Sequence, residues 1–597
     1  MCGIHVLIER GETESQDKSD YTSIWADLIE ANRRRGPDAH NELLATLSNG
    51  NSHTSLKFGA HVLHLRGSHM QSQPLIDRET GDIFCWNGEV FGGLDIGSDS
   101  NDSAVLFDFI RKTKRNDPAG FIARAFSEIE GPYAFVYFDR EQQKLWFARD
   151  YLGRRSLLIN RVGSGALVIS SVATGATSTS CVDGSKVPFT PPVKIGSGWI
   201  ELPSQKIYCI DLGPSSTPES FGFFKEHQWR YGADAEQEDS AFSNCLVLPF
   251  GQVTLDSRDN DDSAKPDAPE PDYQLTDLAR FQPIDLFQPY IDGFKLALME
   301  SIRVRVESIP ERGNGVPRVG ILFSGGVDCI TIAALLAQIL PAGEPVELFN
   351  VAFENPRQTK HVQQGASNIY DVPDRKTGIS GWLELCNRID TQRDWRFVEV
   401  DVPYGQVLEH QAHIRRLLVP SDTVMDMSIG MALWFASRGV GSLVMRVDNE
   451  LERQEYQGGA RVLLLGMGAD EQLGGYSRHR SAWDHGGASQ LGQEIRLDVQ
   501  RIATRNLGRD DRVVSDNSKE ARYPFLAANV VRFLAAVPLH RKMDMRYSRG
   551  IGEKLLLRLL AHQLGLAQSS MLAKRAIQFG ARTAKMESGR TKGQDCL

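Results

Sequence analysis

The chain has 597 residues, and domains of about 100 to 200 residues are usual, so at least two domains are expected. Its 67 Lys and Arg against 76 Asp and Glu give a net charge of −9, without the basic tract that would follow a nucleic-acid backbone. The eight cysteines are scattered, and no apolar run reaches the roughly 18 residues of a membrane span. We expect a soluble, cytoplasmic protein that binds neither nucleic acid nor membrane; the oligomeric state is left open.

The first 210 residues predict a strand-rich domain. Short apolar runs alternate there with Gly, Asn and Asp turns, at residues 61–65, 83–86, 133–138, 145–148 and 167–171. Residues 254–273 are rich in Asp and Pro and have almost nothing to bury, which is typical of a flexible acidic linker. We therefore expect a first domain over residues 2–210 and a connecting segment over 211–285.

Residues 286–590 predict an α/β domain with a parallel sheet. Strand-like runs at 319–323, 346–353 and 462–465 alternate with helical runs such as 330–340 and 427–436. Ligands of such sheets bind at the carboxyl ends of the strands. The polar stretch 448–459 indicates a surface insertion.

Cys2 is a candidate nucleophile. Its small side chain permits removal of Met1, and the freed α-amino group, with a pKa near 7.7–8.0, can act as the base for its own thiol. Further along the chain come the segments NRRRGPD (32–38), LRG (65–67), WNGE (86–89) and ARDYLGRR (148–155). Taken singly, Arg66 also fits a solvated surface arginine, and Asn87-Gly88 a plain turn.

In this order and spacing, these segments resemble the class II glutamine amidotransferases of the N-terminal-nucleophile hydrolase fold. The resemblance implies an αββα sandwich that hydrolyses glutamine. It implies catalytic roles for Cys2, Asn87 and Gly88, with the amide of Asn87 and the backbone N–H of Gly88 stabilising the oxyanion. It further implies that glutamine is bound by Arg66, Asn87, Gly88, Glu89 and Asp102, with Arg66 on the α-carboxylate and Asp102 on the α-ammonium group.

The segment SGGVDC (324–329) predicts a phosphate-binding turn. It follows a strand and precedes an apolar helix, so backbone N–H groups, the Ser324 hydroxyl and the helix dipole can all face an anion. It lacks the Gly-Lys-Ser/Thr of a Walker loop, which argues against γ-phosphate transfer. A plain turn is the alternative.

This segment resembles the SGGxDS loop of ATP pyrophosphatases, and GMGADEQLGGY (466–476) is similar to the GEGADE-type signature of asparagine synthetases. The resemblance implies ATP and Mg²⁺ as cofactors and aspartate as the acceptor. It places ATP at Ser324, Gly325, Gly326, Asp328, Cys329, Val351, Gly466 and Lys554, and the metal at Asp328 and Asp470. The segment EARYPFL (520–526) echoes a further element of the family, which we expect to be structural.

Two positions depart from the family pattern. Met467 stands where asparagine synthetases have a glutamate, and a thioether cannot move a proton; Cys329 replaces a serine and is a poorer hydrogen-bond donor. Nearly the whole chain resembles the asparagine synthetase domain-containing protein 1 group, as VPDRKTG (372–378) illustrates. Three hypotheses follow: a glutamine-dependent synthetase that makes asparagine, a glutaminase with a degenerate nucleotide-binding domain that acts as sensor or binding module, and a non-enzymatic scaffold.

Overall fold

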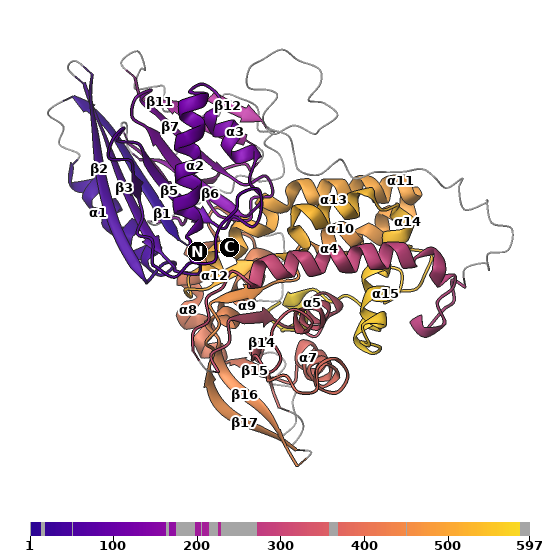
Figure 1. The fold of residues 1–597 in the computed structure, drawn as a ribbon. Helices are drawn as coiled ribbons and strands as arrows, with labels where there is room; N and C mark the ends of the chain where they lie inside the picture. The colour runs from indigo at the N-terminus through magenta and orange to yellow at the C-terminus, as the bar shows by residue number, and fades with distance from the viewer. Residues whose placement is uncertain are drawn as a thin grey trace.

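The computed structural model describes residues 2–12, 18–49, 52–162, 166–174, 198–204, 206–213, 225–228, 272–313, 315–356, 368–448 and 450–584. Most of the predicted acidic linker lies outside the described residues. Figure 1 shows two bodies side by side, the first formed by the amino-terminal third of the chain and the second by the rest. The start of the chain lies where the two bodies meet.

The first domain contains two six-stranded antiparallel sheets. One sheet has the order β10-β8-β9-β1-β3-β2 and the other the order β12-β11-β7-β6-β5-β4. The strands are β1 (Gly3–Glu12), β2 (Ala39–Asn49), β3 (Ser52–Val62), β4 (Leu75–Ile76), β5 (Ile83–Gly88), β6 (Tyr133–Asp139), β7 (Lys144–Arg149), β8 (Leu158–Val162), β9 (Ala166–Ser170), β10 (Ile200–Glu201), β11 (Lys206–Asp211) and β12 (Lys225–Gln228).

The two sheets face each other and helices cover their outer faces. Ile4 and Val6 of β1 pack in one apolar cluster with Val136 of β6, so this core lies between the sheets. Helix α1 (Lys18–Arg33) covers the first sheet through Trp25. Helices α2 (Asp102–Asn116) and α3 (Phe121–Ser127) cover the second sheet through residues such as Phe107. This layering confirms the predicted αββα sandwich.

The second domain is built on a seven-stranded sheet of order β17-β16-β15-β14-β13-β18-β19. The strands from β15 to β19 along this order are parallel. The strands are β13 (Val319–Leu322), β14 (Val346–Phe353), β15 (Trp395–Val402), β16 (Val440–Val447), β17 (Glu450–Gln457), β18 (Val462–Leu464) and β19 (Glu520–Arg522). The helices of eight residues or more are α4 (Gln288–Val306), α5 (Val327–Ala337), α7 (Pro373–Glu384), α8 (Tyr404–Leu418), α9 (Val424–Arg438), α11 (Ser477–Ile502), α12 (Gly508–Ser515), α13 (Ala528–Ala536) and α15 (Leu555–Gln563).

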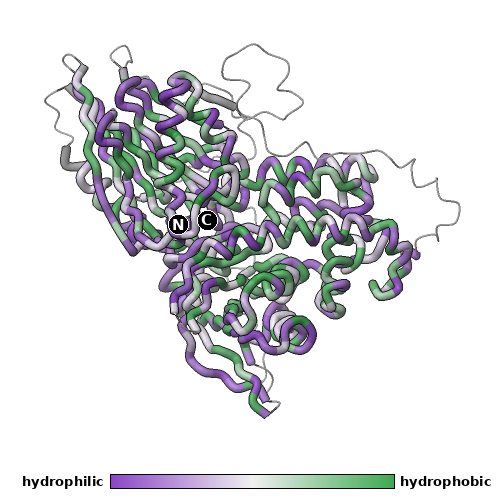
Figure 2. The backbone as a smooth tube through the Cα atoms, viewed as in Figure 1, coloured by the Kyte–Doolittle hydropathy of each residue, from purple (hydrophilic) through white to green (hydrophobic). Residues whose placement is uncertain are grey.

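The parallel strands confirm the predicted α/β sheet, and every residue of β14 is buried. The polar stretch 448–459 is part of the sheet, and not only the surface insertion that the sequence indicated. It contains β17, which pairs with β16 in an antiparallel hairpin at the sheet edge. Most β17 side chains are exposed, and the hairpin projects from the body of the domain. In Figure 2 the hairpin has both hydrophobic and hydrophilic stretches; its edge strand β17, with the sequence ELERQEYQ, is mostly hydrophilic, as suits an edge strand that does not recruit further strands.

The structure describes residues near both ends of the predicted connecting segment, and each end packs with one of the two domains. Strand β12 extends the second sheet of the first domain by pairing with β11. Leu275, Leu278 and Phe281 are buried in the core of the second domain. The domain limits 2–210, 211–285 and 286–590 themselves remain predictions. No helix in the described part of the chain is long and apolar enough to span a bilayer.

Candidate functional site

Cys2 lies immediately before β1 and is buried. Its backbone nitrogen donates a hydrogen bond to Oδ1 of Asn87 on β5, at 3.1 Å. Nε2 of Gln73 lies 3.7 Å from Sγ of Cys2, while Oε1 of the same side chain accepts from the backbone N–H of Trp86 at 2.7 Å. The sequence did not single out Gln73, because no local pattern distinguishes it from other loop glutamines. The nucleophile candidate is therefore held from two sides.

The oxygen and the nitrogen of the Asn87 side-chain amide differ in their hydrogen bonding. Oδ1 accepts from Cys2, whereas the buried Nδ2 has no hydrogen-bond partner among the residues that the structure describes. A buried donor without a partner is costly and is expected where a ligand supplies the acceptor. The adjacent Gly88 has no room for a side chain, since an added Cβ would lie 2.6 Å from the Pro132 carbonyl oxygen. This geometry fits a donor group for an oxyanion next to Cys2.

The thiol of Cys2 needs a base. Burial raises the pKa of the Cys2 thiol, and the positive charge of the chain's amino terminus and a backbone hydrogen bond from Leu63 act in the opposite direction. Because burial is the larger effect, the thiol stays protonated at neutral pH until a nearby group takes its proton. The Cys2 nitrogen, once freed by removal of Met1, is such a group.

The predicted glutamine ligands Arg66, Glu89 and Asp102 lie close to one another. Nη1 of Arg66 donates to the Val90 carbonyl oxygen at 2.6 Å and lies 3.6 Å from Oε2 of Glu89. Oδ2 of Asp102, at the start of α2, accepts from the Val90 N–H at 3.0 Å. The structure thus brings together one guanidinium and two carboxylates, the charges needed for an amino acid's two main-chain groups.

The two carboxylates are buried like charges. Burial and the neighbouring Asp102 raise the pKa of Glu89 to about 7, against the opposing effect of Arg522 and Arg66. Burial also raises the pKa of Asp102, while Arg66 and two hydrogen bonds act against this shift. A bound ammonium group would favour the ionised form of both.

In the second domain, the turn Ser324–Cys329 connects β13 to α5. Gly325 has a φ of +76°, and an added Cβ would lie 2.1 Å from the Thr377 carbonyl oxygen, so only glycine fits. Oγ1 of Thr377, on α7, donates to the Ser324 carbonyl oxygen at 2.7 Å. The helix that carries the VPDRKTG segment therefore supports the turn. The Cys329 thiol donates to the Gly326 carbonyl oxygen at 3.2 Å, inside its own loop.

Lys554 joins the two predicted metal ligands. Its Nζ lies 2.7 and 2.6 Å from the two carboxylate oxygens of Asp328 and 2.6 Å from Oδ1 of Asp470. Lys574, which the sequence did not single out, pairs with the other oxygen of Asp470. Burial is outweighed at Asp470 by Lys554 and Lys574, which hold the pKa of this carboxyl well below its usual range. Lys554 itself has a φ of +58°, an unfavourable conformation that is most often kept at functional sites.

The donor set of Asp328 and Asp470 suits Mg²⁺. No group of three or more His, Cys, Asp or Glu side chains that could hold a metal occurs within the described ranges. Mg²⁺ in nucleotide-using enzymes takes one or two carboxylates, with phosphates and water completing the octahedron. Two carboxylates that face one shared lysine match that requirement.

The other predicted ATP residues lie around the same strand ends. An added Cβ on Gly466 would lie 2.8 Å from Cβ of Asp328, so the GMGADE turn touches the phosphate turn. Val351 is buried near the end of β14, next to β13. Met467 is partly buried against the apolar core, and its position offers no proton-transferring group.

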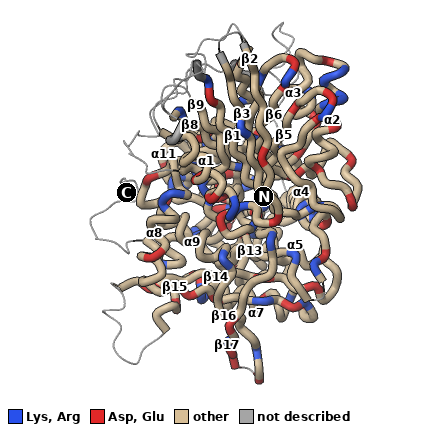
Figure 3. Tube along the Cα trace, turned by 90° about the vertical axis from the view of Figure 1, so that its left-hand side faces the viewer, with Lys and Arg blue, Asp and Glu red and all other residues tan. Residues whose placement is uncertain are grey.

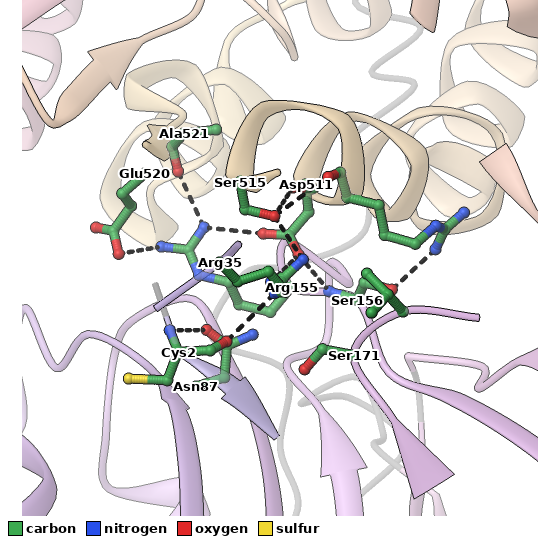
Figure 4. Close-up of polar contacts among 12 residues, drawn as sticks. Cys2, Arg35, Asn87, Arg155, Ser156, Ser171, Asp511, Ser515, Glu520 and Ala521 are labelled. Carbon is green, nitrogen blue, oxygen red and sulfur yellow. Dashed lines mark hydrogen bonds and ion pairs between the residues drawn. The ribbon is translucent and has the colours of Figure 1, made fainter. Parts of the chain in front are cut away.

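Charged groups connect the glutamine site with the second domain. Nη2 of Arg35 lies 2.8 Å from Oδ2 of Asp511, both fully buried, and Nε of Arg35 donates to the Cys2 carbonyl oxygen at 3.4 Å. Nη2 of Arg155 lies 3.3 Å from Oε2 of Glu520. Figure 4 shows Arg35 and Arg155 reaching from the first domain to helix and strand residues of the second. Figure 3 likewise shows both charge types at the junction near the chain start.

Comparisons with known proteins identify a domain family in each half of the chain. Residues 61–175 match the family described as Glutamine amidotransferase domain, and residues 482–592 match the family described as Asparagine synthase. The second family uses ATP.

Relatives extend the match to nearly the whole chain. Asparagine synthetase domain-containing protein 1 of Gallus gallus is 35% identical over 99% of this chain and 98% of its own length. The Homo sapiens protein of the same name is 34% identical over 100% and 97%. Asparagine synthetase [glutamine-hydrolyzing] of Gallus gallus is 22% identical over 94% and 80%. The chain thus belongs to the asparagine synthetase domain-containing protein 1 family, whose members combine a glutamine amidotransferase domain with an asparagine synthetase-like domain.

Proposed function

We propose that this protein is a glutamine-dependent amidotransferase of the asparagine synthetase type, which hydrolyses glutamine at Cys2 and uses the ammonia and ATP to amidate aspartate. The observation that carries the proposal is the Asn87 amide. It holds the Cys2 nitrogen through Oδ1 and keeps a buried, unpartnered Nδ2 beside it. Such a buried donor is costly, and an oxyanion formed beside Cys2 would supply the acceptor that it lacks.

At Cys2, the freed α-amino group takes the thiol proton and the sulfur attacks the side-chain amide carbon of glutamine. Asn87 Nδ2 and the Gly88 N–H stabilise the oxyanion that forms. Ammonia leaves with the proton returned by the amino group, and water then hydrolyses the thioester to glutamate. Arg66 binds the α-carboxylate of glutamine, while Glu89 and Asp102 bind its α-ammonium group.

In the second domain, Ser324, Gly325 and Gly326 bind the phosphates, and Asp328 and Asp470 would hold Mg²⁺, which neutralises phosphate charge when bound. Lys554 lies where it can stabilise the departing pyrophosphate. An aspartate carboxylate oxygen attacks the α-phosphorus and pyrophosphate leaves. Ammonia then attacks the acyl carbon and AMP leaves. Val351 and Gly466 contact the adenosine moiety in this proposal.

The test is to incubate the protein, with Met1 confirmed absent, with aspartate, Mg-ATP and glutamine labelled with ¹⁵N in the side-chain amide. Mass spectrometry is expected to detect labelled asparagine and an equal amount of AMP. The matched control is Cys2→Ala, which should lose the glutamine-driven reaction but keep the reaction driven by ammonium. Loss of both reactions in a folded variant would contradict the proposal.

A second candidate is a glutaminase whose second domain binds nucleotide without making a product. Met467 favours this candidate, because it stands where asparagine synthetases have a glutamate and packs against the apolar core. Glutamate release without labelled asparagine, together with measurable Mg-ATP binding, would favour this candidate over the first.

A further inference from the structure

The Phe91 ring packs against two guanidinium groups of the other domain. It follows the WNGE segment by two residues, next to Glu89 in the glutamine site. Cζ of Arg305, in the last turn of α4, lies 4.7 Å from the centre of the Phe91 ring, and Cζ of Arg522, on β19, lies 5.4 Å from it. Both distances are within the range of cation–π attraction. The loop after Glu89 therefore packs, through Phe91, against two arginine side chains of the second domain.

Arg522 also binds Glu89 directly. Its Nη2 lies 3.2 Å from Oε1 of Glu89, and its Nε lies 2.5 Å from Oε1 of Glu520. Its Nη1 donates to the backbone carbonyl oxygen of Arg305. The guanidinium is fully buried and fixed on three sides. It can thus position Glu89 without moving itself.

The other oxygen of Glu89 is available. Oε2 is buried, has no hydrogen-bond partner in the described part of the chain and is 3.6 Å from Nη1 of Arg66. One oxygen of the Glu89 carboxylate therefore pairs with Arg522 of the second domain. The other oxygen faces Arg66, beside which glutamine binds in the proposed function. This division is what a carboxylate needs to receive an ammonium group in a fixed orientation.

We propose that Arg522 is a positioning residue of the glutamine site: it holds one carboxylate oxygen of Glu89 and, with Arg305, packs against Phe91, so the first domain binds the α-ammonium group of glutamine fully only when the second domain is in place. The inference rests on the proposed function, since it assigns Glu89 to glutamine. It adds a requirement that this site be completed across the domain junction.

The electrostatics support this arrangement. Burial and the Asp102 charge raise the pKa of Glu89 to about 7, while Arg522 opposes the shift. Glutamine binding should weaken as pH falls through this pKa, because protonated Glu89 cannot pair with an ammonium group. Removing the Arg522 charge would raise the pKa of Glu89 further and move this loss to higher pH.

The experiment measures glutamate release against glutamine concentration from pH 5.5 to 9. In Arg522→Met we expect KM at pH 7 to rise at least ~10-fold, and the acid limb of kcat/KM to move up by about one pH unit. We expect kcat at saturating glutamine to change less than about threefold, since no reacting atom is touched. Arg522→Lys should restore much of the wild-type pH profile, because it returns the charge. In Phe91→Leu, KM should rise about threefold because the aromatic ring is lost. The acid limb of kcat/KM should not move, because the Arg522 charge next to Glu89 is still present.

Arg512→Met is the matched control. Arg512 is another fully buried arginine at the junction, but it pairs with Glu201 and Ser156, away from the glutamine space. The Arg512→Met substitution should lower the melting temperature without shifting the acid limb of kcat/KM. An unmoved limb in a folded Arg522→Met would overturn this inference alone. Absence of glutaminase activity in the wild type would overturn the proposed function and this inference with it.

Discussion

The Cys2 nitrogen and the Asn87 side chain are joined by a hydrogen bond of 3.1 Å, formed between residues 85 positions apart. The bond places the proposed base, nucleophile and oxyanion donor within two residues. It also orients Nδ2 of Asn87, because an amide with its oxygen engaged by a donor must present its nitrogen on the other side.

Asn87→Asp tests this orientation. The carboxylate can still accept from the Cys2 nitrogen, but its second oxygen would repel the oxyanion that Nδ2 stabilises. Glutamate release is expected to fall roughly 100- to 1,000-fold in kcat. The ammonium-driven reaction should be unaffected. Asn160→Asp, on β8 of the same domain, is the control and should keep glutaminase activity; wild-type rates in Asn87→Asp would contradict the assignment.

Lys554→Met removes the cation shared by Asp328 and Asp470. The two carboxylates would then face each other with only Lys574 to balance them, and phosphate charge would lose a partner. AMP formation is expected to fall at least about 100-fold, with glutaminase activity changed less than twofold. Lys542→Met, which removes another buried lysine, bound to the Leu534 carbonyl oxygen, should leave AMP formation intact. Equal losses in both variants would indicate a general effect on folding.

Gly325→Ala separates steric clash from backbone strain. Gly325 and Gly343 both have φ near +76°, but an added Cβ meets the Thr377 carbonyl oxygen at 2.1 Å only at Gly325, while Gly343 faces open space. Each alanine carries a strain of about 1 kcal/mol. We expect Gly325→Ala alone to abolish Mg-ATP binding, measured by calorimetry. Retained binding would mean that the turn does not hold the phosphates.

The first domain should lose stability in mild acid through His5 and His61. These rings are buried and stack with centroids 5.6 Å apart, and within the described ranges none of their four nitrogens has a hydrogen-bond partner. Burial lowers the pKa of His61 to about 4 and that of His5 well below its usual value. The unfolded chain, with histidine pKa near 6.5, then binds more protons, so stability is full above pH 6.5 and falls toward pH 4.

His61→Phe removes one of these proton-binding groups while keeping an aromatic ring. The pH slope of the free energy of unfolding between pH 6 and 4.5 should decrease by on the order of 1 kcal/mol per pH unit, measured by urea titration. Exposed His485→Phe serves as the comparison and should keep the wild-type slope. An unchanged slope in His61→Phe would show that the buried ring is already protonated in the folded protein.

Local sequence signals identified the parts of both sites that depend on neighbours along the chain. The Ser324–Cys329 turn was recognisable because a glycine pair must stand between a strand and a helix to expose backbone N–H groups. Asn87 and Gly88 were singled out because their segment, in order with the others, resembles the pattern of class II glutamine amidotransferases. Gln73 and Lys574 could not be found this way, since each acts at a distance: Gln73 on Cys2 and Lys574 on Asp470.

The sequence by itself predicted the two kinds of domain, the nucleophile candidate and a candidate phosphate-binding turn, because hydrophobic periodicity, glycine placement and motif resemblance are all visible over a few residues. Only the tertiary structure decided how the charges are shared. Lys554 between Asp328 and Asp470, and Arg522 between Glu89 and Phe91, join residues hundreds of positions apart. Such pairs form when packing removes water from both partners, and that burial is a property of the folded whole.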